Sequence, residues 1–251
     1  MARRGTLRHL LLTPSRNRHP NEVAPGVHRL GTPVVNWYLI REGDRLTAID
    51  SGLRGYRARL EDDLAAVGAR LDDVEAVVLT HSDGDHTGMA ATMEQAGARV
   101  LIHRRDEPTL RKPGPKGGEA SPVHTLPWLW RPVMLRFTAH LLRNGWARPV
   151  PPKEIELFDD GDALDVPGHP RVVHTPGHTL GHCVLVLGDR GIVFAGDSLC
   201  TWNPYDGSRR GPQVMPPPAN VDNAAARASF DRVLELEADL LLPGHGDPWR
   251  Q

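Results

Sequence analysis

The stretch Leu79-Thr80-His81-Ser82-Asp83-Gly84-Asp85-His86-Thr87-Gly88 decides how the rest of the chain is interpreted. It places two histidines and two aspartates within six residues, directly after the apolar run Val77-Val78-Leu79. Imidazole and carboxylate groups are the ligands that zinc, manganese and iron prefer. Gly84 lets the backbone turn tightly enough for several of these side chains to point inward. The stretch therefore indicates a metal site rather than a polar surface turn.

Three later apolar runs end in the same way. Val172-Val173 leads to Thr175-Pro176-Gly177-His178, Ile192-Val193-Phe194 leads to Ala195-Gly196-Asp197, and Leu240-Leu241-Leu242 leads to Pro243-Gly244-His245. In each case a residue of metal-ligand type follows a buried strand, beside a glycine. If these strands share one sheet and one direction, their ends meet at one edge, where α/β proteins place their sites. The pattern predicts one site assembled from four strand ends.

The sequence resembles the metallo-β-lactamase fold superfamily of metallohydrolases in these same residues. The residues that carry the resemblance are His81-Ser82-Asp83-Gly84-Asp85-His86, Gly177-His178-Thr179, Gly196-Asp197 and Gly244-His245, and it extends from about Val27 onward. The resemblance implies an α/β fold, the αβ/βα four-layer sandwich of the metallo-β-lactamase type. Two sheets would pack face to face, with helices outside and the metals at one edge.

The resemblance also implies a ligand set. His81, Asp83 and His178 would hold one metal ion, here named the first metal position. Asp85, His86 and His245 would hold another at the second metal position, and Asp197 would bridge the two. Asp85 could in addition orient the attacking hydroxide.

Asp83 departs from the family's usual pattern, His-x-His-x-Asp-His. A carboxylate is a harder ligand than imidazole, which favours manganese or iron relative to zinc. Its negative charge makes us expect a weaker Lewis acid and a bound water of higher pKa. We expect two divalent metal ions, zinc by the resemblance and manganese or iron because of Asp83. The alternative is that Asp83 is not a ligand at all.

Composition limits the class of protein. A chain of 251 residues suits one large domain or two small ones. The formal net charge of −1 argues against a nucleic-acid binder that relies on bulk electrostatics. Cys183 and Cys200 are too few for a disulfide framework and favour a reducing compartment. No apolar run suits a signal peptide or a membrane span. We therefore expect a cytoplasmic protein that acts on a small molecule, without nucleic-acid or membrane partners.

Hydrophobic periodicity predicts the secondary structure. Strands are expected at 27–30, 34–40, 46–49, 76–80, 99–102, 155–158, 171–174, 183–187, 192–195 and 239–242, and helices at 56–67, 86–96 and 222–236. Residues 1–22 are rich in Arg, Pro and Asn without periodicity, which indicates an N-terminal arm. Residues 23–251 would form the metallo-β-lactamase-like domain.

Residues 104–153 are interpreted as an apolar cap inserted in that domain. A loop rich in Gly and Pro covers 112–122, and Leu126–Leu142 is markedly apolar. Val133, Phe137 and Leu141 recur at helical spacing after Pro132, which predicts a helix. The cap could be a lid over a hydrophobic substrate, a surface for homo-oligomer formation, or a helix pair that completes the core.

Several other residues are weaker candidates. Tyr205 lies on the loop after Asp197 and could donate a hydrogen bond to an oxyanion, while Arg209 and Arg210 could hold a substrate carboxylate. His182 could support a metal ligand and His103 could line the pocket, although both could be structural. Cys200 is expected to be a buried, inert thiol.

These features favour a metal-dependent hydrolase whose metal-bound hydroxide cleaves an ester-like bond, namely an ester, thioester, lactone or lactam, in a partly hydrophobic substrate. The chain ends six residues after His245, which argues against a glyoxalase II-like thioesterase with its C-terminal helical domain. One alternative is a β-lactamase, although no export signal is visible. Another is a diiron redox protein, because flavodiiron proteins resemble this family and carry Glu where Asp83 lies. The last is a non-catalytic, ligand-binding member of the fold.

Overall fold

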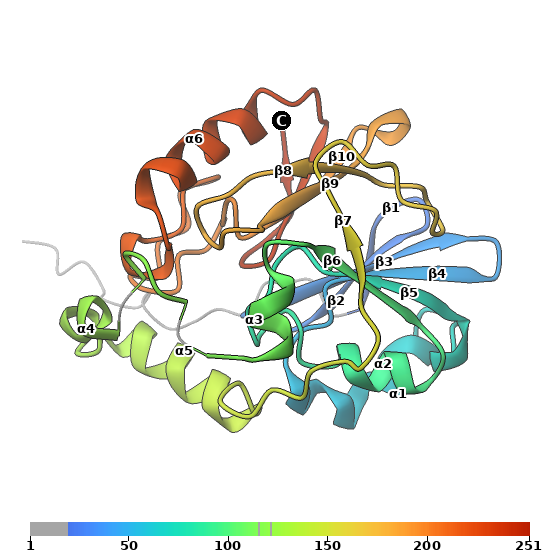
Figure 1. The fold of residues 1–251 in the computed structure, drawn as a ribbon, viewed down its shortest axis with the longest axis horizontal. Coiled ribbons are helices and arrows are strands. Elements are labelled where there is room, and N and C mark those ends of the chain that lie inside the picture. Colours follow the sequence, from blue (N-terminus) through green and yellow to red (C-terminus); the bar gives the residue numbers. More distant parts are fainter. Residues whose placement is uncertain (1–19, 115, 121) are drawn as a thin grey trace, which may run out of the picture.

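The computed structural model describes residues 20–114, 116–120 and 122–251, and its two sheets pack face to face with helices on both outer sides (Figure 1). Most of the predicted N-terminal arm lies outside the described residues. Its last two residues, Asn21 and Glu22, belong to a strand that pairs with the first sheet. Among the described helices, none is long and apolar enough to cross a membrane.

The first sheet has seven strands in sequence order. They are β1 (Asn21–Ala24), β2 (Val27–Gly31), β3 (Asn36–Glu42), β4 (Arg45–Ile49), β5 (Val74–Val78), β6 (Arg99–His103) and β7 (Glu156–Phe158). The strands from β1 to β4 form an antiparallel meander, whereas those from β4 to β7 run parallel. Helices α1 (Arg57–Ala65) and α2 (Ala90–Gln95) cover its outer face (Figure 1).

The second sheet has five strands in the order β12-β11-β10-β9-β8. They are β8 (Arg171–His174), β9 (Cys183–Leu187), β10 (Ile192–Gly196), β11 (Leu240–Pro243) and β12 (Trp249–Arg250). Because β9 is antiparallel to both neighbours and β11 is parallel to β10, strands β8, β10 and β11 point the same way. Helix α6 (Asn223–Leu234) covers the outer face of this sheet.

Alternation along β5 shows how the sequence builds these layers. Val77 packs outward in the cluster under α1 and α2, whereas Ala76 and Val78 pack inward against the second sheet. Side chains alternate in this way because successive residues of a strand face opposite sides of the sheet. Phe194 and Leu242 approach the same inner cluster from the second sheet. The predicted four-layer αβ/βα sandwich is confirmed.

Most predicted elements match, with three corrections. The helix expected from His86 begins only at Ala90, because the His86 carbonyl accepts hydrogen bonds from the backbone amide and hydroxyl of Ser51. Strands β1 and β12 were not predicted. The four strands that precede ligand-type residues do not share one sheet, because β5 belongs to the first sheet and β8, β10 and β11 to the second.

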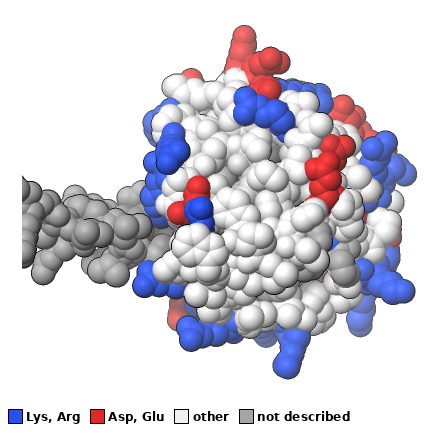
Figure 2. Space-filling view, turned by 90° about the vertical axis from the view of Figure 1, so that its left-hand side faces the viewer, with Lys and Arg blue, Asp and Glu red and all other residues white. Residues whose placement is uncertain are grey.

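In its described residues, the segment predicted as a cap contains the α-helices α3 (Glu107–Arg111), α4 (Pro122–Thr125) and α5 (Pro132–Arg143), and the 3-10 helix η3 (Leu126–Trp128). Helix α5 buries Met134 and Phe137 against Trp202 and Tyr205. Its opposite side exposes Leu135 and Leu142 to solvent. Figure 2 views the side of the molecule where α4 and α5 lie, and few charged side chains interrupt the middle of that face. Whether 104–153 acts as a lid or an association surface stays a prediction.

A fully buried arginine ties the first sheet to the loop after β11. Arg29 donates from Nε to Asn36 Oδ1 (2.9 Å) and from its two terminal nitrogens to Asp247 Oδ1 (3.0 Å) and the Gly246 carbonyl (2.9 Å). Asn36 in turn donates to the carbonyls of Pro243 and Gly246. The loop that carries His245 is therefore held by β2 and β3.

Replacing Arg29→Met should lower the free energy of unfolding by about 3 kcal/mol, because it leaves the buried amide oxygen of Asn36 without its donor and the Asp247 carboxylate without its buried cation. Urea unfolding of the metal-free protein measures the change.

Arg45→Met is the matched control, since the Arg45–Glu75 ion pair lies on the surface and such pairs contribute little. A loss below about 1 kcal/mol for Arg29→Met would contradict the anchoring role of Arg29.

Candidate metal centre

The seven predicted ligand residues lie together at one edge of the sandwich. His81, Asp83, Asp85 and His86 follow β5, His178 follows β8, Asp197 follows β10 and His245 follows β11. All but Asp83 are buried. Both sheets contribute, so the face-to-face packing of the sheets fixes the distances across the site.

The second metal position has ligand atoms at metal-binding separations. His245 Nε2 lies 3.5 Å from Asp85 Oδ2 and 3.3 Å from Asp197 Oδ2. His86 Nε2 lies 3.5 Å from Asp197 Oδ1 and 3.9 Å from Asp85 Oδ2. Donors about 2.0–2.1 Å from one tetrahedral ion are separated by about 3.3 Å. These separations fit a single divalent ion.

The first metal position is similarly spaced. Asp83 Oδ2 lies 3.6 Å from His81 Nε2 and 3.1 Å from His178 Nε2. His178 Nε2 also lies 3.5 Å from Asp197 Oδ2, so Asp197 faces both positions.

Each of the four ligand-type histidines is oriented through Nδ1. His86 Nδ1 donates to Asp50 Oδ2 (2.9 Å), His245 Nδ1 to the Val34 carbonyl (2.7 Å), and His178 Nδ1 to Asn220 Oδ1 (3.2 Å). His81 Nδ1 donates to Thr80 Oγ1 (2.9 Å), because the Thr80 hydroxyl itself donates to the Asp50 carboxylate. With Nδ1 protonated, Nε2 carries the lone pair that a metal ion needs.

Three buried polar atoms at the site have no hydrogen-bond partner within the described part of the chain. They are His81 Nε2, His86 Nε2 and Asp197 Oδ1. A buried polar atom without a partner is costly, and these three converge where the ligand sets predict ions. Groups of His and Asp able to hold a metal ion include His81 with Asp83 and His178, and Asp85 with His86 and His245. The residues therefore fit a divalent metal.

Electrostatics also indicate that the site requires positive charge. Burial disfavours the charged imidazole of His86, but Asp197, Asp50 and Asp85 outweigh burial and raise its pKa to about 10. Burial likewise opposes the ionised Asp197, yet His245 and His86 hold the pKa of its carboxyl well below the usual range. In the absence of a metal ion, protons on the histidines balance the carboxylates.

A glycine is required where the loop after β11 crosses the ligands. A Cβ atom at Gly244 would lie 2.4 Å from Asp197 Oδ1 and 2.5 Å from His86 Cε1. Neither atom can move aside without displacing a side chain of the ligand set. This explains the Pro-Gly-His sequence at this strand end.

Sequence reasoning missed Asp50 and Lys116. Asp50 has a left-handed backbone (φ 59°), and its carboxylate accepts from the amide and hydroxyl of Thr80 and from His86. The only signal for Asp50 was its place at the end of β4 next to Ser51-Gly52. Lys116 brings its ammonium group to Asp83 Oδ2 (2.5 Å) and His178 Nε2 (2.8 Å). No periodicity or motif marked it.

The weaker candidates are placed as follows. His182 Nε2 accepts from the Asp197 amide (2.9 Å), so this histidine supports a ligand residue. His103 stacks on His174 with ring centroids 4.4 Å apart. Cys200 is buried and free, and burial raises the pKa of its thiol.

The candidates on the loop after β10 have other partners. Tyr205 packs edge-on against Trp128 at 5.6 Å and shares a hydrogen bond with Thr125, and burial raises the pKa of its hydroxyl. Arg209 pairs with Asp247 and Arg210 is exposed. An oxyanion role for Tyr205 stays a prediction.

The chain belongs to the Metallo-beta-lactamase superfamily, whose pattern matches residues 30–245. This assignment makes it an enzyme of the metallo-β-lactamase-fold hydrolases, in agreement with the predicted fold and the resemblance.

Relatives of known name agree with this class. The chain is 28% identical over 219 residues to a probable metallo-hydrolase, YqjP, of Bacillus subtilis, covering 84% of this chain and 66% of that protein. It is 28% identical over 186 residues to the human acyl-coenzyme A thioesterase MBLAC2, covering 68% of this chain and 62% of that protein. The chain thus spans just under two thirds of the length of these relatives.

A solved structure shares the architecture. The metallo-beta-lactamase family protein TTHA1429 from Thermus thermophilus matches with a TM-score of 0.67 and 28% identity, covering 91% of this chain and 76% of that one.

Asp50→Asn should weaken zinc binding by about 10–100-fold. An amide in place of the carboxylate can present its NH₂ group to His86 Nδ1, which then becomes the acceptor and leaves Nε2 protonated. Titration against a chromophoric zinc chelator measures the affinity.

Asp63→Asn provides the same chemical change in α1, where Asp63 pairs with Arg59 away from the ligands. Equal zinc affinity in Asp50→Asn and Asp63→Asn would show that Asp50 does not orient His86.

Proposed function

We propose that the chain is a divalent-metal hydrolase that cleaves an ester or thioester bond in a substrate with an apolar acyl group. The observation that carries the proposal is that Phe137 and Trp202, here named the apolar wall, lie against a ligand residue. Phe137 of α5 lies edge-on to the His245 imidazole with ring centroids 5.7 Å apart, and to Trp202 at 5.9 Å.

The carboxylates and imidazoles beside this wall could support hydrolysis of an acyl bond. A divalent ion held by these residues would lower the pKa of a water ligand and would polarise the acyl oxygen. Asp85 can accept the proton of the attacking water, because its carboxylate lies beside the second metal position, 3.9 Å from His86 Nε2 and 3.5 Å from His245 Nε2. Asp197 holds the two positions in fixed relation.

The cap supports an apolar acyl group rather than a polar substrate. Met134, Phe137, Trp202 and Tyr205 form one buried cluster, and Trp128, Leu129 and Val133 pack against it. Burial of acyl methylenes against such side chains is worth about 0.8 kcal/mol each. The relative named acyl-coenzyme A thioesterase supports the same class of bond. Zinc, manganese or iron each suit the ligands, and the identity of the ion and a dinuclear centre stay predictions.

Removal of metal should abolish hydrolysis. Protein dialysed against a strong chelator is expected to lose at least about 99% of its activity on 4-nitrophenyl esters and acyl-coenzyme A thioesters, because a metal-activated water supplies the nucleophile. Readdition of zinc, manganese or iron(II), each alone, identifies the active ion. Full activity in protein shown by elemental analysis to hold no metal would contradict the proposal.

Phe137→Ala should change the preference for acyl length. We expect kcat/KM for an octanoyl ester to fall about 10-fold while that for the acetyl ester stays within about two-fold, because only the longer chain reaches the apolar wall.

Leu135→Ala is the matched control, since Leu135 lies on the same helix and is 53% exposed. A flat response to chain length in the unaltered protein would exclude the apolar acyl specificity while leaving the metal-dependent chemistry intact.

A further inference from the structure

We infer that Lys116 supplies the positive charge at the first metal position, so that the protein holds one divalent ion tightly at the second position and admits another only by displacing Lys116. This inference rests on the proposed metal site and specifies how many ions it holds.

The ammonium group of Lys116 has a complete set of partners at the first position. It donates to Asp83 Oδ2 at 2.5 Å, to His178 Nε2 at 2.8 Å and to the Ala219 carbonyl at 3.0 Å. An ammonium group has three protons, and these three acceptors satisfy all of them. The ammonium group is therefore held in place by ligand atoms, as a metal ion would be, and Lys116 is not a mobile surface lysine.

A cation is required at that point by the two acceptors that face each other. His178 Nδ1 donates to Asn220 Oδ1, because the amide nitrogen of Asn220 is engaged with the Met215 carbonyl and Asn223 Oδ1. His178 Nε2 must accept from the Lys116 ammonium, which can only donate, so it carries a lone pair, yet it lies 3.1 Å from the carboxylate oxygen of Asp83. Two acceptors at this distance repel unless a positive group lies beside both. Lys116 is that group.

The loop that carries Lys116 is fixed to the same segment that orients His178. The Glu119 amide donates to the Val221 carbonyl (2.9 Å), and the Glu119 carboxylate accepts from the Asn223 side chain. A Cβ atom at Gly118 would lie 2.3 Å from the Val221 carbonyl oxygen, which shows how closely the two backbones approach. Residues 219–223 thus position both the cation and its imidazole partner.

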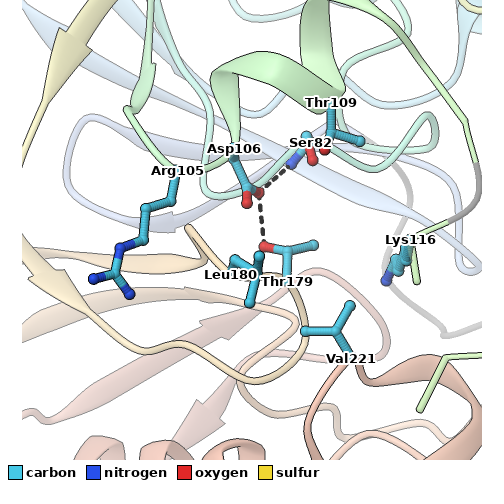
Figure 3. A pocket seen from close by; sticks show the side chains of 8 residues that line it. All are labelled: Ser82, Arg105, Asp106, Thr109, Lys116, Thr179, Leu180 and Val221. Atoms are coloured by element: carbon cyan, nitrogen blue, oxygen red, sulfur yellow. Dashed lines mark hydrogen bonds between the residues drawn. The ribbon is translucent and has the colours of Figure 1, made fainter. Parts of the chain in front are cut away.

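Figure 3 shows Lys116 at the margin of a small pocket with Ser82, Thr179 and Val221 around it. On the other side of that pocket Asp106 accepts from the Ser82 amide and the Thr179 hydroxyl, so its carboxylate is already hydrogen-bonded without Lys116. Asp83, not Asp106, is the anion that Lys116 neutralises.

The charges at the site balance with one ion. The three carboxylates that face the two metal positions, Asp83, Asp85 and Asp197, carry as many charges as one divalent ion and the Lys116 ammonium together, whereas Asp50 lies behind His86. The Lys116–Asp83 pair also gives the carboxylate at position 83, where the usual pattern has histidine, a partner of opposite charge, which a neutral imidazole at this position would not be.

No lysine or arginine of the described residues is paired with the ligands of the second position. Within the described residues, the close partners of Asp85, His86 and His245 at this position are one another and Asp197. The first position keeps one uncommitted ligand atom, His81 Nε2, which has no hydrogen-bond partner in the described part of the chain. A further ion can therefore enter there, but only at the expense of the Lys116 contacts.

The test counts metal ions in Lys116→Met. Metal-free proteins are titrated with Zn²⁺ and, separately, Mn²⁺ by calorimetry, and the bound ions are counted by elemental analysis after gel filtration. The unaltered protein is expected to retain one ion, with a further ion bound about 100-fold or more weakly, and Lys116→Met is expected to retain two. Lys116→Arg, which keeps the charge, should retain one.

Lys153→Met is the control, because the exposed Lys153 lies at the other end of the cap segment and should leave the count at one. Circular dichroism confirms that each variant is folded, and Lys116→Ala replaces Lys116→Met if the latter is not. Two ions of similar affinity in the unaltered protein, or a single ion in both neutral variants at position 116, would overturn the inference.

Metal counting keeps this inference separate from the proposed function. One ion in the unaltered protein and two in Lys116→Met uphold it even if no ester is hydrolysed. Hydrolysis with two equally tight ions overturns it while the proposed function stands.

Discussion

The rest of this structure depends on one constraint: the Nε2 atoms of the ligand histidines and the carboxylate oxygens beside them are buried close together and need a shared positive charge. Each ligand histidine donates a hydrogen bond from Nδ1, and the acceptors are Asp50, Thr80, the Val34 carbonyl and Asn220. Every Nε2 lone pair therefore points into the site. The carboxylates of Asp85 and Asp197 point to the same place. Such an arrangement is stable only around positive charge. The fold therefore specifies a cation before any catalytic step is considered.

The two sheets supply this arrangement through their packing. Ligand residues after β5 come from one sheet, whereas His178, Asp197 and His245 come from the other. The inner cluster of Val78, Phe194 and Leu242 sets the distance between the sheets, and Arg29 ties the His245 loop to β2 and β3. Side chains that lie far from the chemistry thus fix ligand separations of a few ångströms.

Much of this could be predicted from the sequence, because the main ligand residues follow apolar runs directly. The runs before His81, His178, Asp197 and His245 form strands because their alternating or continuous apolar side chains are buried on one or both faces. Local pattern predicted the helix from Pro132 for the same reason.

The remainder depends on contacts between distant segments, which local pattern does not encode. The helix after His86 begins late because Ser51, which follows another strand, donates hydrogen bonds to the His86 carbonyl. The assignment of β5 to one sheet and of β8, β10 and β11 to the other follows from pairing partners. Lys116 reaches the site only because Gly118 and Glu119 contact residues a hundred positions later. A lysine in a loop rich in Gly and Pro gives no sign of this.

The edge-on contact between Phe137 and His245 has a thermodynamic consequence. One aromatic ring belongs to the apolar wall and the other to the ligand set, so each ligand class meets the same pair of side chains. Binding free energies at two linked sites are reciprocal. An apolar acyl compound that contacts Phe137 should therefore change the affinity for the ion by the same factor by which the ion changes the affinity for that compound. Substrate and metal would then act as mutual effectors through this one ring contact.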